Sequence, residues 1–415
     1  MLEDYEKLIT NNSVKHQLLQ YRDKGDVREL FQYRSFSGFW SIIKSDSIWA
    51  RNIRFSNDNQ EQKQGLEILK MYYSKQKNNE ITEVENTKPK INEAIEDEQD
   101  YFMVCFCEQD DVLSQWRGYA PEGGVSMSFE INSQLPYEIV SDNDKFDVVL
   151  KPHQVIYLDK NNEDEYEQIF KDISANENRF SPEKNPKDNE LSLVPYLKDK
   201  GFIEEKEWRV IISEKFNNID SKTLRKFIKF QKIDDLEIPY VVIKAGNTKL
   251  DKFPSKVKLQ IYDGKIREKI FKDLSEKNIT VIDCYDGYIN KIDCVGCTKN
   301  VKMYQLGDKS PYEECRNIDD YLGINKFDKS IVITQGYDQE EIFELIDTYV
   351  KNENIKDIKV WCEGHLPIRR VTVSPCENRD YIVENIKNYF KNSNQYWLRY
   401  VDVNKSNIPY RSKLK

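Results

Sequence analysis

The spacing of apolar and polar residues along the first half of the chain predicts helices and strands mixed together. Apolar residues recur at helical spacing from Leu2 to about Phe31, and the residues that follow, "FQYRSF", switch to an extended pattern. Apolar runs between turn signals, as in "YFMVCFCE" (101–108) and "GVSMSFEI" (124–131), predict buried strands. The other elements predicted here are helices at 38–46, 59–76 and 110–120, the last capped by Asp, and a strand within 47–55.

After about residue 235 strands and helices alternate. "KVKLQIYDG" precedes the helix "KIREKIFKDLSEK" and the strand "ITVIDC", and a similar order recurs at 329–364. We predict an α+β first part over 1–235 and an α/β second part over 236–415. The insertions predicted are charged ones at 77–100 and 158–200 and a candidate one at 286–365.

One strand carries an unusual set of charges. "EEKEWRVII" (204–212) alternates like a strand, which places Glu205, Glu207 and Arg209 on one face. Burial of two carboxylates and a guanidinium on one strand face costs free energy, because the charged groups lose their hydration. This face is therefore a candidate site.

Composition and charge narrow the class of protein. The 415 residues are 39% hydrophobic and 12% aromatic, which is typical of a globular protein. A net charge of -9 argues against a chain that binds nucleic acid over its whole surface. The basic segment "SKTLRKFIKFQK" (221–232) is best interpreted as a solvated helix whose Phe227 and Phe230 pack inward.

Membrane and secretion signals are not found in the sequence. No apolar run approaches the ~18 residues that cross a bilayer, and the acidic start is unlike a signal peptide. A cytoplasmic protein without a membrane partner is expected, with its eight cysteines reduced. The C-x2-C spacing of Cys294 and Cys297 suits zinc, but we favour an ordinary turn, and no metal site is predicted.

Common catalytic motifs do not identify an enzymatic activity. The sequence has no Walker-type phosphate loop, dinucleotide glycine fingerprint, HExxH or GxSxG. The three histidines, His16, His153 and His365, form no recognisable constellation, and a structural role is favoured for each.

Three separated segments together suggest a dinucleotide site. Arg34 and Ser35 precede a predicted helix N-terminus, where a guanidinium and backbone N–H groups suit a pyrophosphate. Trp116 and Tyr119, at i and i+3, could enclose a flat ring such as nicotinamide. A carboxylate such as Glu207 could stabilise an oxocarbenium-like ribose. From the residues alone, a site that cleaves a nicotinamide dinucleotide and a partly buried ion-pair network are about equally supported.

The chain resembles the bacterial family known as domain of unknown function 2971 over nearly its whole length. The segments that carry the resemblance are "YRSFS" (33–37), "FSNDNQE" (55–61), "VCFCEQDDVLSQWRGYAPEGGVSMSFE" (104–130), "VIYLD" (155–159), "EEKEWR" (204–209) and "VTVSP…SNIPYR" (371–411). In the second segment Asn57, Asp58 and Glu61 fit the family pattern, whereas Asn59 and Gln60 depart from it.

The order of these segments is similar to that of ADP-ribosyltransferases, and the similarity implies a split β core with helices. It implies an NAD-dependent mono-ADP-ribosyltransferase or NAD glycohydrolase, with NAD as substrate, acting as a toxin or anti-phage effector. Glu207 would be the catalytic carboxylate and Glu205 its helper. The binding residues implied are Tyr33, Arg34, Ser35, Asn57, Asp58, Trp116, Tyr119 and Arg209. The acceptor, protein or nucleic acid, and any regulatory partner protein stay open.

Two other functions remain open. A metal-dependent nuclease could gather Mg²⁺ with Asp58, Glu61, Glu205 and Glu207. A non-catalytic module could sense a nucleotide in the same cleft and use the α/β part to contact a partner.

Overall fold

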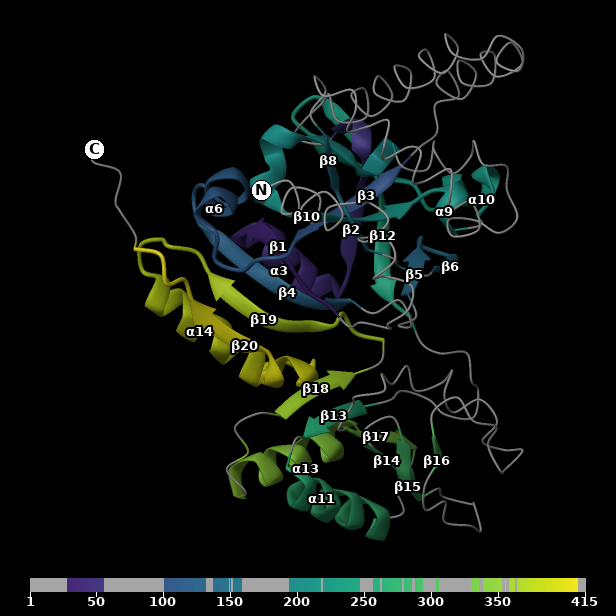
Figure 1. The fold of residues 1–415 in the computed structure, drawn as a ribbon, viewed down its shortest axis with the longest axis vertical. Coiled ribbons are helices and arrows are strands. Elements are labelled where there is room, and N and C mark those ends of the chain that lie inside the picture. The colour runs from purple at the N-terminus through teal and green to yellow at the C-terminus, as the bar shows by residue number, and fades with distance from the viewer. Residues whose placement is uncertain are drawn as a thin grey trace, which may run out of the picture. The chain divides into compact units, whose positions relative to one another are not determined.

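The computed structural model describes residues 28–55, 101–131, 137–148, 150, 152–158, 194–217, 219–246, 257–261, 263–277, 280–285, 288–293, 304–305, 330–335, 339–352, 355, 358–362 and 364–409. These residues form a mixed α/β protein with a large mixed β-sheet and several helices (Figure 1). The helix predicted at 59–76, the insertion at 77–100 and the "CVGC" turn lie outside them. The helical spacing predicted from Leu2 to about Phe31 lies outside them up to residue 27, and at its end it is wrong, because Arg28–Phe31 belong to the strand β1 (Arg28–Ser35).

The chain divides into two compact units whose segments alternate along the sequence. Unit 1 comprises Met1–Asp26, Ile48–Gln109 and Ile139–Ile243, and unit 2 comprises Val27–Ser47, Asp110–Glu138 and Lys244–Lys415. The predicted division at residue 235 stays a prediction.

Unit 1 is built mainly from antiparallel strands. Two of its strands, β5 and β12, extend by two residues beyond its bounds. Its elements are β2 (Ile48–Asn52), η1 (Ile53–Phe55), β3 (Phe102–Cys107), β5 (Tyr137–Val140), β6 (Lys145–Val148), β7 (His153–Gln154), β8 (Ile156–Leu158), η4 (Val194–Tyr196), β9 (Leu197–Asp199), η5 (Lys200–Glu205), β10 (Glu207–Ile212), α9 (Glu214–Asn217), α10 (Ser221–Arg225), β11 (Lys229–Ile233) and β12 (Leu236–Ala245).

The strand order in unit 1 brings β10 beside β3, and β10 begins at the second glutamate of Glu205-Lys206-Glu207, which we call the E-x-E segment. Antiparallel pairs join β10 to β3, β3 to β2, β2 to β12 and β12 to β11, while β7 pairs with the other side of β10. All six residues of β10 are buried, as expected for a strand with neighbours on both sides. β8 and β9 form a separate parallel pair.

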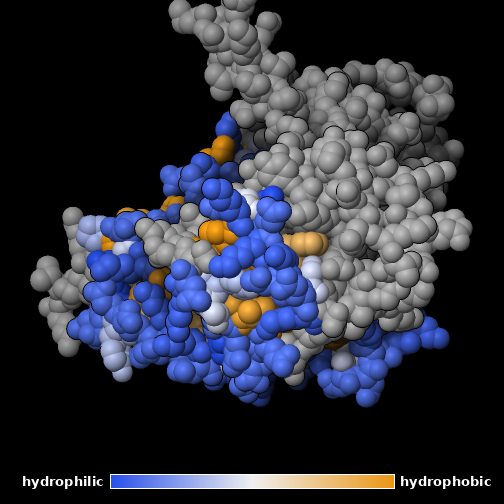
Figure 2. Space-filling model, turned by 90° about the horizontal axis from the view of Figure 1, so that it is seen from below, coloured by the Kyte–Doolittle hydropathy of each residue, from blue (hydrophilic) through white to orange (hydrophobic). Residues whose placement is uncertain are grey.

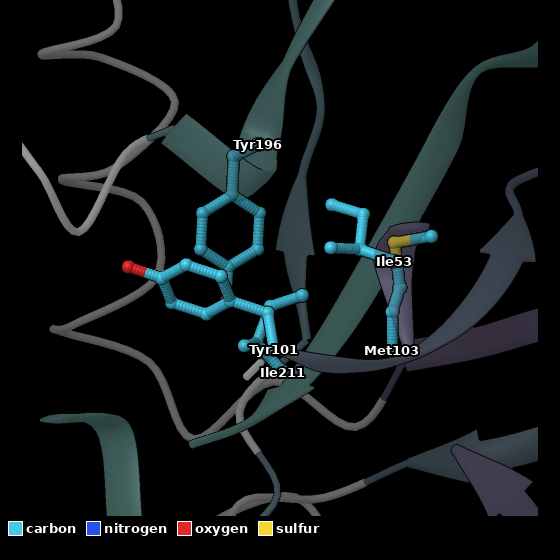
Figure 3. Close-up of a cluster of buried hydrophobic side chains, with 5 residues drawn as sticks. All are labelled: Ile53, Tyr101, Met103, Tyr196 and Ile211. Carbon is cyan, nitrogen blue, oxygen red and sulfur yellow. The ribbon is translucent and has the colours of Figure 1, made fainter. Parts of the chain in front are cut away.

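A hydrophobic cluster packs against β3 and β10. It consists of Ile53, Tyr101, Met103, Tyr196 and Ile211 (Figure 3). The two tyrosine rings lie close together near Ile211, while Ile53 and Met103 pack side by side. Burial raises the pKa of both tyrosines, so their hydroxyls stay protonated. The cluster fixes η4, which leads into β9 and the site described below.

Unit 2 contains four strands of the large sheet, the six-stranded sheet and the long helices of the described residues. Its elements are β1 (Arg28–Ser35), α3 (Phe36–Ser45), α6 (Leu113–Tyr119), β4 (Gly124–Ile131), β13 (Val257–Ile261), α11 (Gly264–Glu276), β14 (Thr280–Tyr285), β15 (Tyr288–Asp293), β16 (Tyr304–Gln305), β17 (Ser330–Gln335), α13 (Gln339–Asn352), β18 (Ile358–Cys362), β19 (Ile368–Val373), α14 (Arg379–Asn392), η7 (Tyr396–Tyr400) and β20 (Asp402–Lys405).

The first group of strands in unit 2 joins early and late parts of the chain. β4 pairs antiparallel with β1 on one side and with β19 on the other, and β19 pairs parallel with β20. Gly124 opposes Ser35 in this register, and a Cβ on Gly124 would lie 2.1 Å from the Arg34 carbonyl oxygen. Only glycine allows β1 and β4 to approach this closely.

The second sheet of unit 2 confirms the strand and helix alternation predicted after residue 235. Its order is β16-β15-β14-β17-β13-β18. The four strands β18-β13-β17-β14, with α11 joining β13 to β14 and α13 joining β17 to β18, have the order of a split βαβ motif. Asp263 caps α11 by accepting hydrogen bonds from Lys265 N and Ile266 N at 2.8 and 3.1 Å.

The surface of the described residues is largely polar in the view from below (Figure 2). Hydrophobic positions appear there as small separate spots among hydrophilic ones. Within the described ranges every helix is too short or too polar to span a bilayer.

Candidate functional site

The E-x-E segment contains a turn that the alternation of its residues did not reveal. Residues 204–212 were predicted as one strand, but Glu205 ends the 3-10 helix η5 and only Glu207 to Ile212 form β10. Lys206 between them is left-handed, with φ of 43°. Its carbonyl accepts a 3.2 Å hydrogen bond from Glu108 N, so a distant residue helps to hold the turn.

Glu207 and Arg209 lie on one face of β10, as predicted, and form a buried ion pair. Arg209 is 0% exposed and Glu207 is 5% exposed. Arg209 Nε donates to Glu207 Oε1 at 2.8 Å and Nη2 donates to Oε2 at 2.8 Å. Its Nη1 donates to the Pro195 carbonyl at 2.7 Å. The guanidinium thus fixes the plane of the carboxylate by two parallel hydrogen bonds.

Lys198 joins the two glutamates and was missed from the sequence. Its Nζ donates to Glu205 Oε2 at 2.7 Å and to Glu207 Oε2 at 2.9 Å. Lys198 is only 4% exposed, whereas the Glu205 side chain is 21% exposed. A lysine that ends the apolar run "LVPYLK" within a charged stretch was the available signal.

These cations keep Glu207 ionised. Burial by itself raises the pKa of a carboxyl group, but the charge and hydrogen bonds of Arg209, the charge of Lys198 and a hydrogen bond from Cys105 outweigh it. The pKa of Glu207 falls from its ordinary 4.5 to about 2. Together the cluster of Lys198, Glu205, Glu207 and Arg209 holds two carboxylates and two cations within unit 1.

The strand neighbours complete the surroundings of the cluster. Cys105 opposes Arg209 and Cys107 opposes Glu207 in the β3–β10 register. Glu207 N donates to the Tyr157 hydroxyl at 2.8 Å, and burial raises the pKa of that hydroxyl. The Glu207 backbone and side chain are therefore both fixed.

The predicted pyrophosphate residues belong to unit 2. Ser35 caps α3, since its Oγ accepts a 3.3 Å hydrogen bond from Gly38 N. Arg34 is half-buried on β1, and the Tyr33 hydroxyl accepts a 2.9 Å hydrogen bond from Val112 N. A guanidinium and a capped helix N-terminus thus lie in consecutive positions, as predicted.

The two predicted aromatic residues differ in exposure. Trp116 is 3% exposed and its ring lies edge-on to Tyr33 with centroids 4.6 Å apart, while Tyr119 is 38% exposed. The Trp116 indole N–H donates to Asp111 Oδ1 at 2.9 Å. Trp116 thus has a packing role in unit 2, and Tyr119 offers the accessible ring.

The prediction that Asp caps α6 is wrong. The N-cap is Val112, which makes no side-chain cap hydrogen bond. Asp111 instead adopts φ of 56° and its carboxylate accepts hydrogen bonds from Trp116, the Ser406 hydroxyl and, at 2.7 Å, Asn407 N. Its competing partners on the C-terminal segment explain why it does not cap the helix.

The last predicted binding residues and the candidate metal ligands remain to be placed. Asn57 and Asp58 lie outside the described residues. Among the residues that the structure describes, no group of three or more His, Cys, Asp or Glu could hold a metal ion.

The family comparison agrees with part of the resemblance. Residues 115–210 match the family model described as "Protein of unknown function (DUF2971)". This match supports the resemblance to that family, and it includes most of α6 and the E-x-E segment. Comparisons with curated proteins and with solved structures gave no match.

Proposed function

We propose that this protein is an NAD-dependent ADP-ribosyltransferase or NAD glycohydrolase, acting as a bacterial toxin or anti-phage effector in the cytoplasm. The observation that carries the proposal is the pair of carboxylates bound by one buried ammonium, Lys198, at 2.7 and 2.9 Å. The ADP-ribosyltransferase-like split β core is part of the same proposal.

The chemistry follows from the charge of the cluster. When the bond between ribose C1′ and nicotinamide breaks, nicotinamide leaves with the bonding electrons and positive charge develops on the ribose. Glu207, ionised and fixed by Arg209, supplies negative charge that needs no reorganisation at that moment. Glu205, the more exposed carboxylate, accepts the proton of the acceptor hydroxyl or of water as the new bond to C1′ forms.

The binding residues predicted from the sequence keep their proposed roles. Arg34 and the N-terminus of α3 capped by Ser35 suit the pyrophosphate, and Tyr119 offers a ring for stacking. Tyr33 and Trp116 support these groups through their mutual packing. Asn57 and Asp58 keep their proposed binding role.

The cluster favours this activity over a metal-dependent nuclease. Lys198 and Arg209 already bind the oxygens of Glu205 and Glu207 that a Mg²⁺ ion would require.

The test is to incubate the purified chain with NAD labelled in the adenosine part and, separately, in nicotinamide. We expect release of nicotinamide, with label transferred to an acceptor or recovered as free ADP-ribose. Glu207→Gln should lower turnover by about 10²–10³, comparable with losses of other preorganised electrostatic groups.

A matched control separates catalysis from loss of folding. Glu108→Gln removes the charge of another β10 partner, since Glu108 Oε1 accepts a 3.0 Å hydrogen bond from the Trp208 indole. Turnover per folded molecule should persist in Glu108→Gln and fall in Glu207→Gln. Absence of nicotinamide release from the wild type, or full activity of both Glu205→Gln and Glu207→Gln, would overturn the proposal.

A further inference from the structure

The basic segment 221–232 is not the single helix that its sequence predicted. Residues Ser221–Arg225 form α10 (Figure 1), and Lys229–Ile233 form the strand β11. The prediction that both phenylalanines pack inward is half wrong, because Phe227 is 2% exposed and Phe230 is 60% exposed. A large aromatic ring therefore stands in solvent within the most basic stretch of an acidic chain.

The cations of this segment are presented to solvent together. Lys222, Arg225 and Lys226 are exposed and follow i, i+3 and i+4 spacing, so they share one face of the helical turn. Lys229 Nζ forms an ion pair with Asp142 Oδ1 at 2.5 Å. Among the described residues, the other three cations named here form no ion pair with a carboxylate.

The strand β11, which follows α10 in the chain, carries two further exposed side chains of this segment. Phe230 and exposed Lys232 are two residues apart on β11 and so lie on one face of it. In the described part of the chain β11 pairs with β12 alone. We call Lys222, Arg225, Lys226, Phe230 and Lys232 the α10–β11 surface.

We propose that the α10–β11 surface binds single-stranded nucleic acid. Four cations within eleven residues match a run of phosphates, and the chain's net charge of -9 confines such binding to a local surface. The exposed Phe230 ring distinguishes nucleic acid from an acidic protein, because unpaired bases stack on aromatic rings. A duplex, whose bases are already stacked, would leave the ring unused.

The test is a fluorescence anisotropy titration of a labelled 20-nucleotide single strand of mixed sequence, at several salt concentrations and without NAD. Binding should weaken with salt, with a logarithmic slope of about -2 to -3 if the four cations each contact a phosphate. Lys222→Glu/Arg225→Glu/Lys226→Glu should weaken binding at least about 10-fold. Phe230→Ala should weaken it about 5-fold or more by removing base stacking.

The matched control carries the same change of charge elsewhere. Lys265→Glu/Lys272→Glu/Lys277→Glu alters exposed lysines of α11 and its end, and it should leave binding unchanged. Equal weakening by both triple variants, or no salt-sensitive binding by the wild type, would overturn the proposal. So would an equally charged oligoglutamate that binds as tightly as the single strand. Because NAD is absent, the result does not depend on the proposed enzyme activity.

Discussion

Glu207 keeps its negative charge inside unit 1 because two cations replace the water it loses. Arg209 and Lys198 donate to both carboxylate oxygens at 2.8–2.9 Å, so neither oxygen is left without a donor. Removal of the Glu207 charge alone should destabilise the fold, because the buried Arg209 and Lys198 would then have only the Glu205 carboxylate to balance their charges.

We therefore expect Glu207→Gln to lower the free energy of unfolding by about 3–5 kcal/mol at pH 7. Chemical denaturation measures the free energy of unfolding of Glu207→Gln. Glu214→Gln, a substitution outside the cluster, serves as the control. Little change in the first variant, or an equal loss in the second, would contradict the assignment of a buried network.

The stability of the wild type should also depend on pH through this group. The folded pKa of about 2 lies below the ordinary value of 4.5, so the contribution of Glu207 is complete above about pH 5 and is lost as the pH falls toward 2. Its size is about 3 kcal/mol. Urea denaturation at pH 7, 5 and 3 should show the difference between the wild type and Glu207→Gln shrinking as the pH falls. A difference that stays constant would show that Glu207 is not ionised by this network.

At the scale of elements, the loop before α6 is tied to the end of the described chain. Asp111 binds Ser406 and Asn407, while Asp110 Oδ2 accepts a 2.6 Å hydrogen bond from the Thr372 hydroxyl on β19. Ser406 N also donates to the Val373 carbonyl at 2.8 Å. The position of α6 therefore depends on segments almost 300 residues away.

Asp111→Ala should remove the hydrogen bonds that the Asp111 carboxylate accepts from Trp116, Ser406 and Asn407. The free energy of unfolding should fall by about 2–3 kcal/mol, because hydrogen bonds to a charged group are the strong ones. Ser406→Ala removes one of them and should cost about 1 kcal/mol. Hydrogen exchange should rise in α6 and in 402–409 for Asp111→Ala. Faster exchange spread evenly over unit 2 would show a general loss of stability instead of a local release.

The elements that sequence predicted best are those whose own residues carry the pattern. "YFMVCFCE" and "GVSMSFEI" became β3 and β4, and 38–46 lies within or beside α3. The turn at Lys206 was missed because its left-handed backbone is held by Glu108, which is distant in sequence. The Glu207–Arg209 pair was predictable from period 2 alone, whereas Lys198 reaches the cluster from β9, and no local spacing relates the two strands.

At the scale of the whole molecule, strand pairing connects segments far apart in the sequence. β4 lies between β1 and β19, and β10 lies against β3. The matched segment 115–210 contains β4 and the first four residues of β10, but it contains none of the partner strands β1, β3 and β19. A split of the chain at residue 235 would likewise part β4 from β19 and β2 from β12.

We therefore expect neither 115–210 nor 1–235 to fold when expressed alone, because each would expose strand edges and apolar faces that are paired in the whole chain. Circular dichroism during heating should show no cooperative transition for either fragment, while the full chain unfolds cooperatively. Coexpression of 1–235 with 236–415 provides the control, since the missing strands β12 and β19 are then supplied in trans and should restore a cooperative transition. A cooperative transition of 1–235 alone would instead support the first part as an independent domain, as its sequence predicts, and would show that pairing with β12 and β19 is dispensable for its folding.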